Sequence, residues 1–434
     1  MKNKMSKQIL EAILTGIFCL STASTLMAEE KMVTLSELVS IALANNGELK
    51  ALREEIEIFA ANKIKAGFYP NPTLELEGEN GARNYNKKEN LASIGIGQEL
   101  LTGGKRAKRL AVAEQELQGF NLRIIDAERR LLLELKTGYH DFVLARNRVD
   151  LARKSAELSS KLLDIAKARF AAGEIAELDV NLARLEAARG EGKKREAEED
   201  SARMRERMLS LTGVSMEEQF AVADSFSLKP VTKTSEDLKA LALQNRPDLK
   251  ALHAENRKGE AEIALAKAER IPNLTSGLAF IREKKTVPAG ETDERDTDYF
   301  VGLKLSVPLP VFDRNQAGLQ EARAKKAGAE HRHRFLLRNI EREVTGAHGR
   351  LVASGKTVLL FQEGILPQLN ENLKLVQKSY RLGEVGILAG IEEQKKFAEV
   401  NDDYLLALHA RNTALAELEA AVGVELGESD GGNK

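Results

Sequence analysis

The chain has 434 residues, 43% hydrophobic and 30% charged, and its 65 basic and 66 acidic side chains give a formal net charge of -1. This near balance removes the electrostatic reason to expect nucleic-acid binding. No apolar run reaches the roughly 20 residues of a membrane-spanning helix, which excludes a polytopic helical membrane protein. Aromatic residues make up only 5%, and the abundance of Ala, Leu, Glu, Lys and Arg is typical of long helices.

The first 28 residues have the features of a signal peptide. Three lysines come first, an apolar run follows at residues 12–20, and Ala28 precedes a plausible cleavage site. Cys19 is the only cysteine, so the mature chain is expected to hold neither disulfides nor thiolate metal sites. Export of a chain without cysteine suits the envelope of a Gram-negative bacterium. The alternative is a buried N-terminal helix.

The chain contains an internal duplication. Residues 38–52 recur as residues 238–252, and the Gly-Glu segment at 170–175 recurs at 380–385. Each half therefore predicts a helix, short β segments, a very long helix, a Gly-Glu turn and a returning helix. The predicted organisation is a signal peptide (1–28), a first structural repeat (29–212), an equatorial linker (213–235), a second structural repeat (236–423) and a polar C-terminal tail (424–434).

Each half also contains two segments that alternate apolar and polar residues. Leu74 and Leu76 alternate with Glu75 and Glu77, which predicts a strand with one oily and one polar face. Strands of about 8 to 11 residues suit a tilted bilayer crossing; a soluble sheet packed on helices is the alternative. The segments lie near residues 73–79, 93–97, 274–280 and 299–307, and the polar stretches 79–90 and 282–297 are expected to be hairpin ends in water.

Four strands are too few to close a membrane barrel, because the smallest single-chain barrels have about eight. Open sheet edges do not occur in lipid, where unpaired backbone groups find no partner. If these strands enter a membrane, several protomers must share one barrel, and the protein is an obligate oligomer.

The stretch 106–171 contains no proline, and its apolar residues recur at alternating steps of three and four. One extra step of four leads from Leu131 to Leu135, and the second repeat has the same step from Ile340 to Val344. This pattern predicts a coiled-coil seam with a stutter in each half. Some 65 residues form a helix near 100 Å long, since each residue rises about 1.5 Å.

Such a helix is too long for a compact core. It fits either a dimeric coiled coil or a cylinder of helices around a water-filled bore, with the strands as its membrane end. Beyond Pro367 the apolar line shifts by one residue, so a bend is expected there. The helices that end at Phe68 and Arg270 are expected to stack end to end on the shorter returning helices.

The residues resemble those of the TolC-like outer membrane efflux proteins over essentially the whole mature chain. The most specific matches are residues 70–77 (PNPTLELE), 98–106 (QELLTGGKR) and 305–315 (LSVPLPVFDRN). The chain looks like the branch that serves heavy-metal exporters of the cobalt–zinc–cadmium and copper–silver type. The resemblance implies a mainly α homotrimer with a membrane β part. Each protomer contributes four strands to a shared 12-stranded barrel, which stands on a long α-helical periplasmic tunnel. Some members are lipoproteins, but no lipobox precedes Cys19.

The same resemblance implies where partners and cargo are met. It places a contact with a periplasmic membrane-fusion adaptor at the tip formed by the two Gly-Glu turns, although glycine also simply ends a helix there. It places an acidic channel constriction at Glu392 and at Asp179, the first-repeat counterpart of Ala389; a ring of carboxylates favours cations. A solvated helix face is the alternative for Glu392. The tip residues are Phe170, Gly173, Glu174, Tyr380, Gly383 and Glu384.

An enzyme is not expected, and neither is a bound metal or cofactor. His331 and His333 are two residues apart and do not share a helix face, and no His/Asp/Glu grouping has zinc-site spacing. There is no nucleophile elbow and no phosphate loop. All histidines are expected to be helix-surface or packing residues: His140, His253, His331, His333, His348 and His409.

The resemblance implies the outer-membrane channel of a tripartite, RND-type efflux system, a passive exit duct for heavy-metal cations. Its expected partners are the adaptor, an inner-membrane pump, outer membrane lipid and two further copies of the chain, and not nucleic acid. The expected location is the outer membrane, with extension into the periplasm. Multidrug efflux and type I secretion through the same channel are alternatives, and a secreted coiled-coil structural protein without a pore is an alternative of another class.

Overall fold

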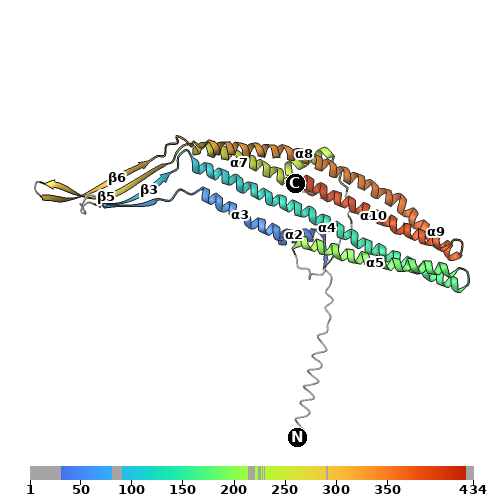
Figure 1. Ribbon diagram of the computed structural model, residues 1–434. Coiled ribbons are helices and arrows are strands. Elements are labelled where there is room, and N and C mark those ends of the chain that lie inside the picture. Colours follow the sequence, from blue (N-terminus) through green and yellow to red (C-terminus); the bar gives the residue numbers. More distant parts are fainter. Residues whose placement is uncertain are drawn as a thin grey trace, which may run out of the picture.

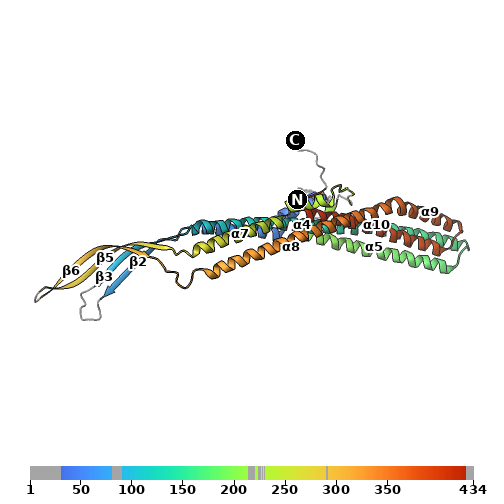
Figure 2. The same ribbon diagram turned by 90° about the horizontal axis from the view of Figure 1, so that it is seen from above.

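The molecule is a long rod with a four-stranded sheet at one end and helices along the rest (Figures 1 and 2). The computed structural model describes residues 31–80, 90–213, 220–222, 226, 228, 230–289 and 292–426. The predicted signal peptide, residues 427–434 of the predicted tail and part of the predicted linker lie outside this description. None of the helices in these ranges is long and apolar enough to cross a membrane.

The same order of elements occurs twice, which confirms the duplication. The first copy comprises β1 (Lys31–Val33), α2 (Leu35–Asn45), α3 (Gly47–Ala66), β2 (Thr73–Asn80), β3 (Asn90–Leu100), α4 (Lys105–Ala171) and α5 (Glu177–Thr212). The second comprises β4 (Phe220–Val222), α6 (Ser235–Asn245), α7 (Pro247–Glu269), β5 (Leu274–Ala289), β6 (Thr292–Ser306), α8 (Gln316–Leu360), the π-helical turn η1 (Phe361–Ile365), α9 (Leu366–Leu382) and α10 (Ile387–Val422).

Both copies begin their first helix with the same device. Thr34 forms a capping box with Glu37 at the start of α2, and Thr234 forms one with Asp237 at the start of α6. In each box the hydroxyl accepts a backbone N–H from the first turn and the carboxylate accepts the N–H of the threonine, which satisfies donors that a helix start leaves open. The local sequence thus sets the start of the helix at equivalent points of the two repeats.

The sheet has the order β2-β3-β5-β6 and is antiparallel throughout. Its register places Leu74, Ile96, Leu278 and Leu303 in one row across the four strands. These apolar side chains are exposed in the single chain, Leu303 by 87%. The opposite face carries glutamates and small residues. The alternation predicted from the sequence is therefore confirmed, and β2 and β6 form the two edges of the sheet.

The second hairpin is longer than predicted. Residues 282–289 and 292–297 belong to β5 and β6 instead of forming a polar loop. The pairing continues through Lys284 with Thr297 and Lys285 with Asp296. A strand with polar residues on both faces is stable where both faces meet water. The charged residues of 282–297 therefore did not show where these strands end. The expectation of a polar loop is therefore wrong for these residues, and residues 290 and 291 between them lie outside the described ranges.

A second, small sheet was not predicted. β1 pairs in parallel with β4, which joins the start of the first repeat to the connection between the repeats. Each strand has three residues, too few for a detectable alternation. Val33 of β1 is buried in a core cluster with Leu38, Leu135 and Tyr139. The connection is thus fastened to the middle of the rod.

The long helices pack along the predicted seams. α4 contacts α3, α5, α7 and α10, and α8 contacts α7 and α10. The residues on both sides of each stutter, Leu131 with Leu135 and Ile340 with Val344, are buried. The seam and its stutter are therefore confirmed in both repeats.

The predicted bend near Pro367 coincides with the π-helical turn η1, which immediately precedes α9. A π turn inserts one extra residue into a helix. This explains why the apolar line shifts by one residue, and in Figure 2 α9 curves away from the line of α8.

The ends of the shorter helices meet at the middle of the rod, as expected. In the first repeat, the Asn46 side chain donates a hydrogen bond to the carbonyl oxygen of Leu211 (Nδ2–O 3.1 Å) and caps the start of α3. In the second repeat, Arg246 occupies the same corner and donates from Nη1 to the carbonyl oxygen of Ala421 at 3.2 Å. An amide thus joins the helix ends in one repeat and a guanidinium in the other.

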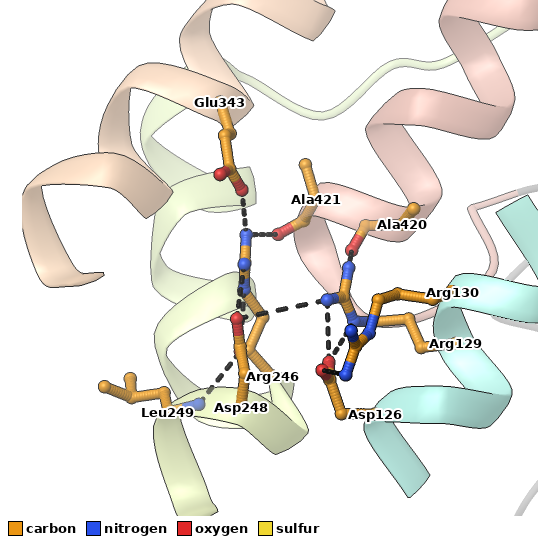
Figure 3. A network of polar contacts seen from close by, with 9 residues as sticks. All are labelled: Asp126, Arg129, Arg130, Arg246, Asp248, Leu249, Glu343, Ala420 and Ala421. Atoms are coloured by element: carbon orange, nitrogen blue, oxygen red, sulfur yellow. Dashed lines mark hydrogen bonds and ion pairs between the residues drawn. The ribbon is translucent and has the colours of Figure 1, made fainter. Parts of the chain in front are cut away.

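Arg246 is the centre of a charged network that joins four helices (Figure 3). It is only 3% exposed and forms ion pairs with Asp248 of α7, at 2.6 Å, and with Glu343 of α8. Arg129 of α4 donates to Asp126 at 2.7 Å and to the carbonyl oxygen of Ala420 at 2.8 Å. Burial acts to raise the pKa of Asp248, but the hydrogen bonds and charge of Arg246 hold it below its usual value.

Candidate functional site: the tip of the helices

The two Gly-Glu turns lie together at the end of the rod opposite the sheet (Figure 1). Gly173 and Gly383 both adopt left-handed backbone angles, with φ of 76° and 82°. The N–H of Glu174 donates to the carbonyl oxygen of Arg169, and the N–H of Glu384 to that of Ser379, each at 2.9 Å. This is the Schellman pattern, which satisfies open carbonyls at a helix end and favours glycine.

Arg169 connects the first turn to the second. Its Nε donates to Glu174 of its own turn at 2.9 Å, and its Nη1 donates to the backbone carbonyl of Tyr380 at 3.0 Å. The guanidinium also lies over the Tyr380 ring, 5.3 Å from the ring centroid. At the matching position of the second repeat, Ser379 donates only to Glu384, at 2.8 Å. Arg169 was not among the predicted site residues.

The two aromatic residues of the predicted tip have different surroundings. Tyr380 is 1% exposed, whereas Phe170, its counterpart in the first repeat, is 46% exposed. Burial raises the pKa of the Tyr380 hydroxyl. Tyr380 belongs to an apolar cluster that fills the space between α4, α5, α9 and α10 and consists of Leu162, Ala166, Val180, Ala183, Tyr380, Ile387 and Ile391.

The rim of the tip is apolar and exposed. Phe170 and Leu178 flank the first turn, and Leu382 and Leu388 flank the second. Each of the three leucines is at least 59% exposed in the single chain. Exposed apolar side chains gathered at one end of a charged rod are typical of a contact surface for another protein.

The predicted constriction residues lie one to two turns inward from the tip. Asp179 is half-buried near the start of α5, and Glu392 is exposed near the start of α10. Within the described residues neither side chain forms an ion pair. Ala389, the second-repeat counterpart of Asp179, is also half-buried.

A cavity of about 800 Å³ lies between α4, α5 and α10, between the tip and the middle of the rod. Charged residues line much of it, among them Glu186, Asp200 and Arg207. Arg148 and Asp402 bridge α4 and α10 beside it, with Nε and Oδ1 2.6 Å apart. Apolar side chains, among them Leu144, Leu151 and Met204, line the rest of the cavity.

In the described part of the chain, no three His, Cys, Asp or Glu residues are grouped to hold a metal ion. His140 is buried beside Phe226, and burial, together with the charges of His409 and Lys136, lowers its pKa to about 4. His409 pairs with Asp141 at 2.8 Å. His253 and His333, which are 80 residues apart, lie in contact.

A sheet with one exposed apolar face, continued by helices about 100 Å long that end in an apolar tip, defines a membrane channel subunit with a long helical extension. The chain belongs to the outer membrane efflux protein family, which it matches over residues 38–214 and 238–424. Members of this family are channel proteins, not enzymes. The predictions of an efflux channel and of an outer membrane location with extension into the periplasm are confirmed.

Individual relatives agree with this assignment. The chain is 24% identical to the cobalt-zinc-cadmium resistance protein CzcC of Cupriavidus metallidurans over 391 residues, 90% of each chain. It is 22% identical to the nickel-cobalt-cadmium resistance protein NccC of Alcaligenes xylosoxydans xylosoxydans over 338 residues, 76% of this chain and 73% of the relative. The crystal structure of CusC has the same fold, with a TM-score of 0.73, 16% identity and coverage of 93% of this chain and 96% of that one.

Proposed function

We propose that three copies of the chain form one passive duct through which an inner-membrane pump, joined by a periplasmic adaptor, exports heavy-metal cations. In this proposal residues 29–212 and 236–423 are the two structural repeats, and the chain itself carries out no covalent chemistry. The observation that supports it most strongly is an ion pair between the two edge strands of the sheet.

Lys304 of β6 reaches Glu75 of β2 across both central strands, with Nζ and Oε2 2.7 Å apart. Three strand spacings amount to about 14 Å in a flat sheet. The contact therefore requires a sheet that curves toward its polar face. Gly97 and Gly277 share a row with Lys304 and leave the space above the central strands open.

This curvature has the direction that a barrel needs. The apolar rows of Leu74, Ile96, Leu278 and Leu303 lie on the convex face, where a barrel meets lipid, and the glutamates lie on the concave face. Since an open edge has no partner in lipid, β2 of one copy would pair with β6 of the next. Three copies then supply the twelve strands of a closed barrel.

The charge along the proposed route is mainly negative. Glu77, Glu79, Glu283 and Asp298 lie on the same face of the sheet as Glu75. Farther inward, Asp179 and Glu392 would form rings of three carboxylates each around the threefold axis. Rings of carboxylates attract cations and repel anions.

The apolar rim of the tip is the proposed adaptor contact, centred on Phe170, Gly173, Glu174, Tyr380, Gly383 and Glu384. Phe170, Leu382 and Leu388 would supply the exposed apolar area. Tyr380, which is buried, would act by holding the two turns together. Phe170→Ala and Leu388→Ala should each reduce cross-linking to the adaptor, while Val352→Ala, an exposed apolar site on α8 far from the tip, should not.

Conductance of the reconstituted protein tests the duct itself. A membrane-inserted, cation-favouring pore is expected, and a soluble, non-conducting protein would support the coiled-coil structural alternative instead. Asp179→Asn with Glu392→Gln should lower the cation-to-anion permeability ratio, and Glu198→Gln, an exposed carboxylate farther along α5, serves as the matched control. An unchanged ratio in the double variant would reject the constriction.

The cargo is tested in cells. The heavy-metal proposal rests on the resistance proteins CzcC and NccC, which are named for cobalt, zinc, nickel and cadmium. Loss of the gene should sensitise cells to these divalent metals, and the intact gene should restore resistance. Sensitivity to dyes and antibiotics alone, or loss of a secreted protein, would instead favour the drug-efflux or type I secretion alternatives.

A further inference from the structure

Two histidines from different helices face each other on the barrel-proximal half of the rod. His253 lies on α7 and His333 on α8, and their Nε2 atoms are 3.4 Å apart. The ring centroids are 4.6 Å apart and the ring planes meet at 63°. His253 is exposed and His333 half-buried, so the pair is open to solvent in the chain.

The helix seam holds this pair in place. α7 and α8 run antiparallel here, since Glu255 pairs with Arg332 at 2.6 Å and Glu260 with Lys326 at 3.1 Å. Gly259 contributes to the close approach, because a Cβ at this position would lie 3.0 Å from the Lys326 side chain. The two imidazoles are thus presented from two packed helices and not from a loop.

The two Nε2 atoms face each other within hydrogen-bond distance. Two neutral rings that meet through Nε2 must share one proton between these atoms or leave two lone pairs facing each other. Neutral imidazole nitrogen is the form that binds metal ions.

We propose that His253 and His333 form a two-histidine clamp for a divalent transition cation of the zinc type. Zinc–nitrogen bonds of about 2.0–2.1 Å at a tetrahedral angle place two ligand nitrogens about 3.3–3.4 Å apart, which matches the observed separation. Imidazole suits zinc, copper and nickel, whereas magnesium and calcium prefer oxygen. The proposal rests on the geometry of the two histidines and does not depend on the identity of the cargo.

The surroundings also set the character of the site. Glu255, a carboxylate of the seam two residues from His253, is already paired with Arg332. In the described chain no third His, Cys, Asp or Glu completes a cluster with the two histidines. Water would fill the other positions, so the cation exchanges readily. When bound, it links α7 to α8 and stabilises the seam by mass action.

Zinc titration of the full mature protein, purified in detergent without a polyhistidine tag, tests the clamp. One zinc ion per chain is expected by calorimetry, together with a higher thermal unfolding midpoint and no effect of magnesium. Cobalt bound in place of zinc should show the visible absorption of a tetrahedral ion.

His253→Gln and His333→Gln should each weaken zinc binding at least about tenfold, because even the loss of a supporting partner weakens metal sites by that factor. His331→Gln is the matched control: it lies on the same helix two residues away, with its Nδ1 next to Arg334. Circular dichroism checks that each variant is folded. Unchanged zinc affinity in both variants, or an equal loss in His331→Gln, would overturn the proposal and leave a simple hydrogen bond between two imidazoles.

Discussion

Residues 169–174 and 379–384 form the same backbone turn with different side-chain roles. The helix-ending geometry is shared, with glycine at φ near 80° and glutamate next to it. The aromatic residue, however, points outward in the first copy as Phe170 and is buried in the second as Tyr380. The two repeats therefore share the backbone of the turn, whereas the aromatic side chain is exposed in the first and packed in the interior in the second.

The middle of the rod shows a similar division. Asn46 fastens its corner with neutral hydrogen bonds, while Arg246 fastens the equivalent corner with buried ion pairs. Arg246 thereby joins α7, α8 and α10, and Arg129 links α4 to the same point. The second repeat thus joins its helices at this corner through charged contacts, where the first repeat uses neutral ones.

The largest expected difference between the repeats is at the aromatic pair. Tyr380→Ala should destabilise the tip by about 4 kcal/mol, because it empties a buried aromatic site. Phe170→Ala should leave the tip stable within about 0.5 kcal/mol, because its ring is largely in water. Hydrogen exchange of the amides near both turns measures the effect, and Tyr380→Phe should retain most of the protection. Equal effects of the two alanine variants would contradict the division of roles.

At the middle of the rod, Arg246→Met should cost about 3 kcal/mol, because it leaves Asp248 without its buried partner. Asn46→Ala should cost only about 1 kcal/mol, the usual value of a lost helix cap. Thermal unfolding of the detergent-solubilised protein would show which of the two variants has the lower unfolding midpoint. A lower unfolding midpoint for Asn46→Ala than for Arg246→Met would show that the ion pairs of Arg246 are not the stronger of the two connections.

Acid should weaken the first repeat before the second. His140 in the first core has a pKa of about 4 in the folded chain, against 6.5 when exposed, so the unfolded state binds more protons between these values. Stability is therefore constant above pH 6.5 and falls by up to about 3 kcal/mol as the pH drops toward 4. Hydrogen exchange at pH 7 and pH 5 should report faster opening around residues 134–145 than around 340–351. His140→Phe should remove this difference; its persistence in the variant would assign the effect to another group.

The smallest expected difference concerns the two turn glycines. Alanine at either position should cost about 1 kcal/mol, since both have left-handed backbone angles. A Cβ on Gly173 meets open space, whereas one on Gly383 lies 3.1 Å from Nη2 of Arg169. Gly383→Ala should therefore be slightly more harmful, as measured by unfolding midpoints. In an Arg169→Ala background the two glycine variants should become equal.

Periodic features of the fold could be predicted from the sequence because they repeat many times. The seam from Leu131 to Leu135, its copy at Ile340 and Val344, and the alternation of Leu74 and Leu76 each report a local geometry. In the structure the helix residues of these patterns are buried along one stripe, and the strand residues are exposed on one face of the sheet. The shift of the apolar line beyond Pro367 predicted a bend, and the structure has a π turn immediately before this point.

Contacts between distant residues could not be predicted in this way. His253 and His333 meet only because α7 and α8 pack antiparallel in one particular register, which their local sequence does not state. In the sequence Arg169 does not differ from the many surface arginines, because its contact with the backbone of Tyr380 depends on the packing of the second turn against the first. The same holds for the pairing of β1 with β4, which depends on three residues in each strand.

The long helical stretches of the two repeats have equal lengths, although the first is one continuous helix and the second contains a π turn. α4 has 67 residues, and α8, η1 and α9, with 45, 5 and 17, reach the same number. Both turns therefore reach the same depth, and the proposed adaptor would meet a level rim. An insertion in only one stretch would recess the other turn by about 1.5 Å per added residue. The equal length of the two stretches would thus be a requirement of the proposed adaptor contact.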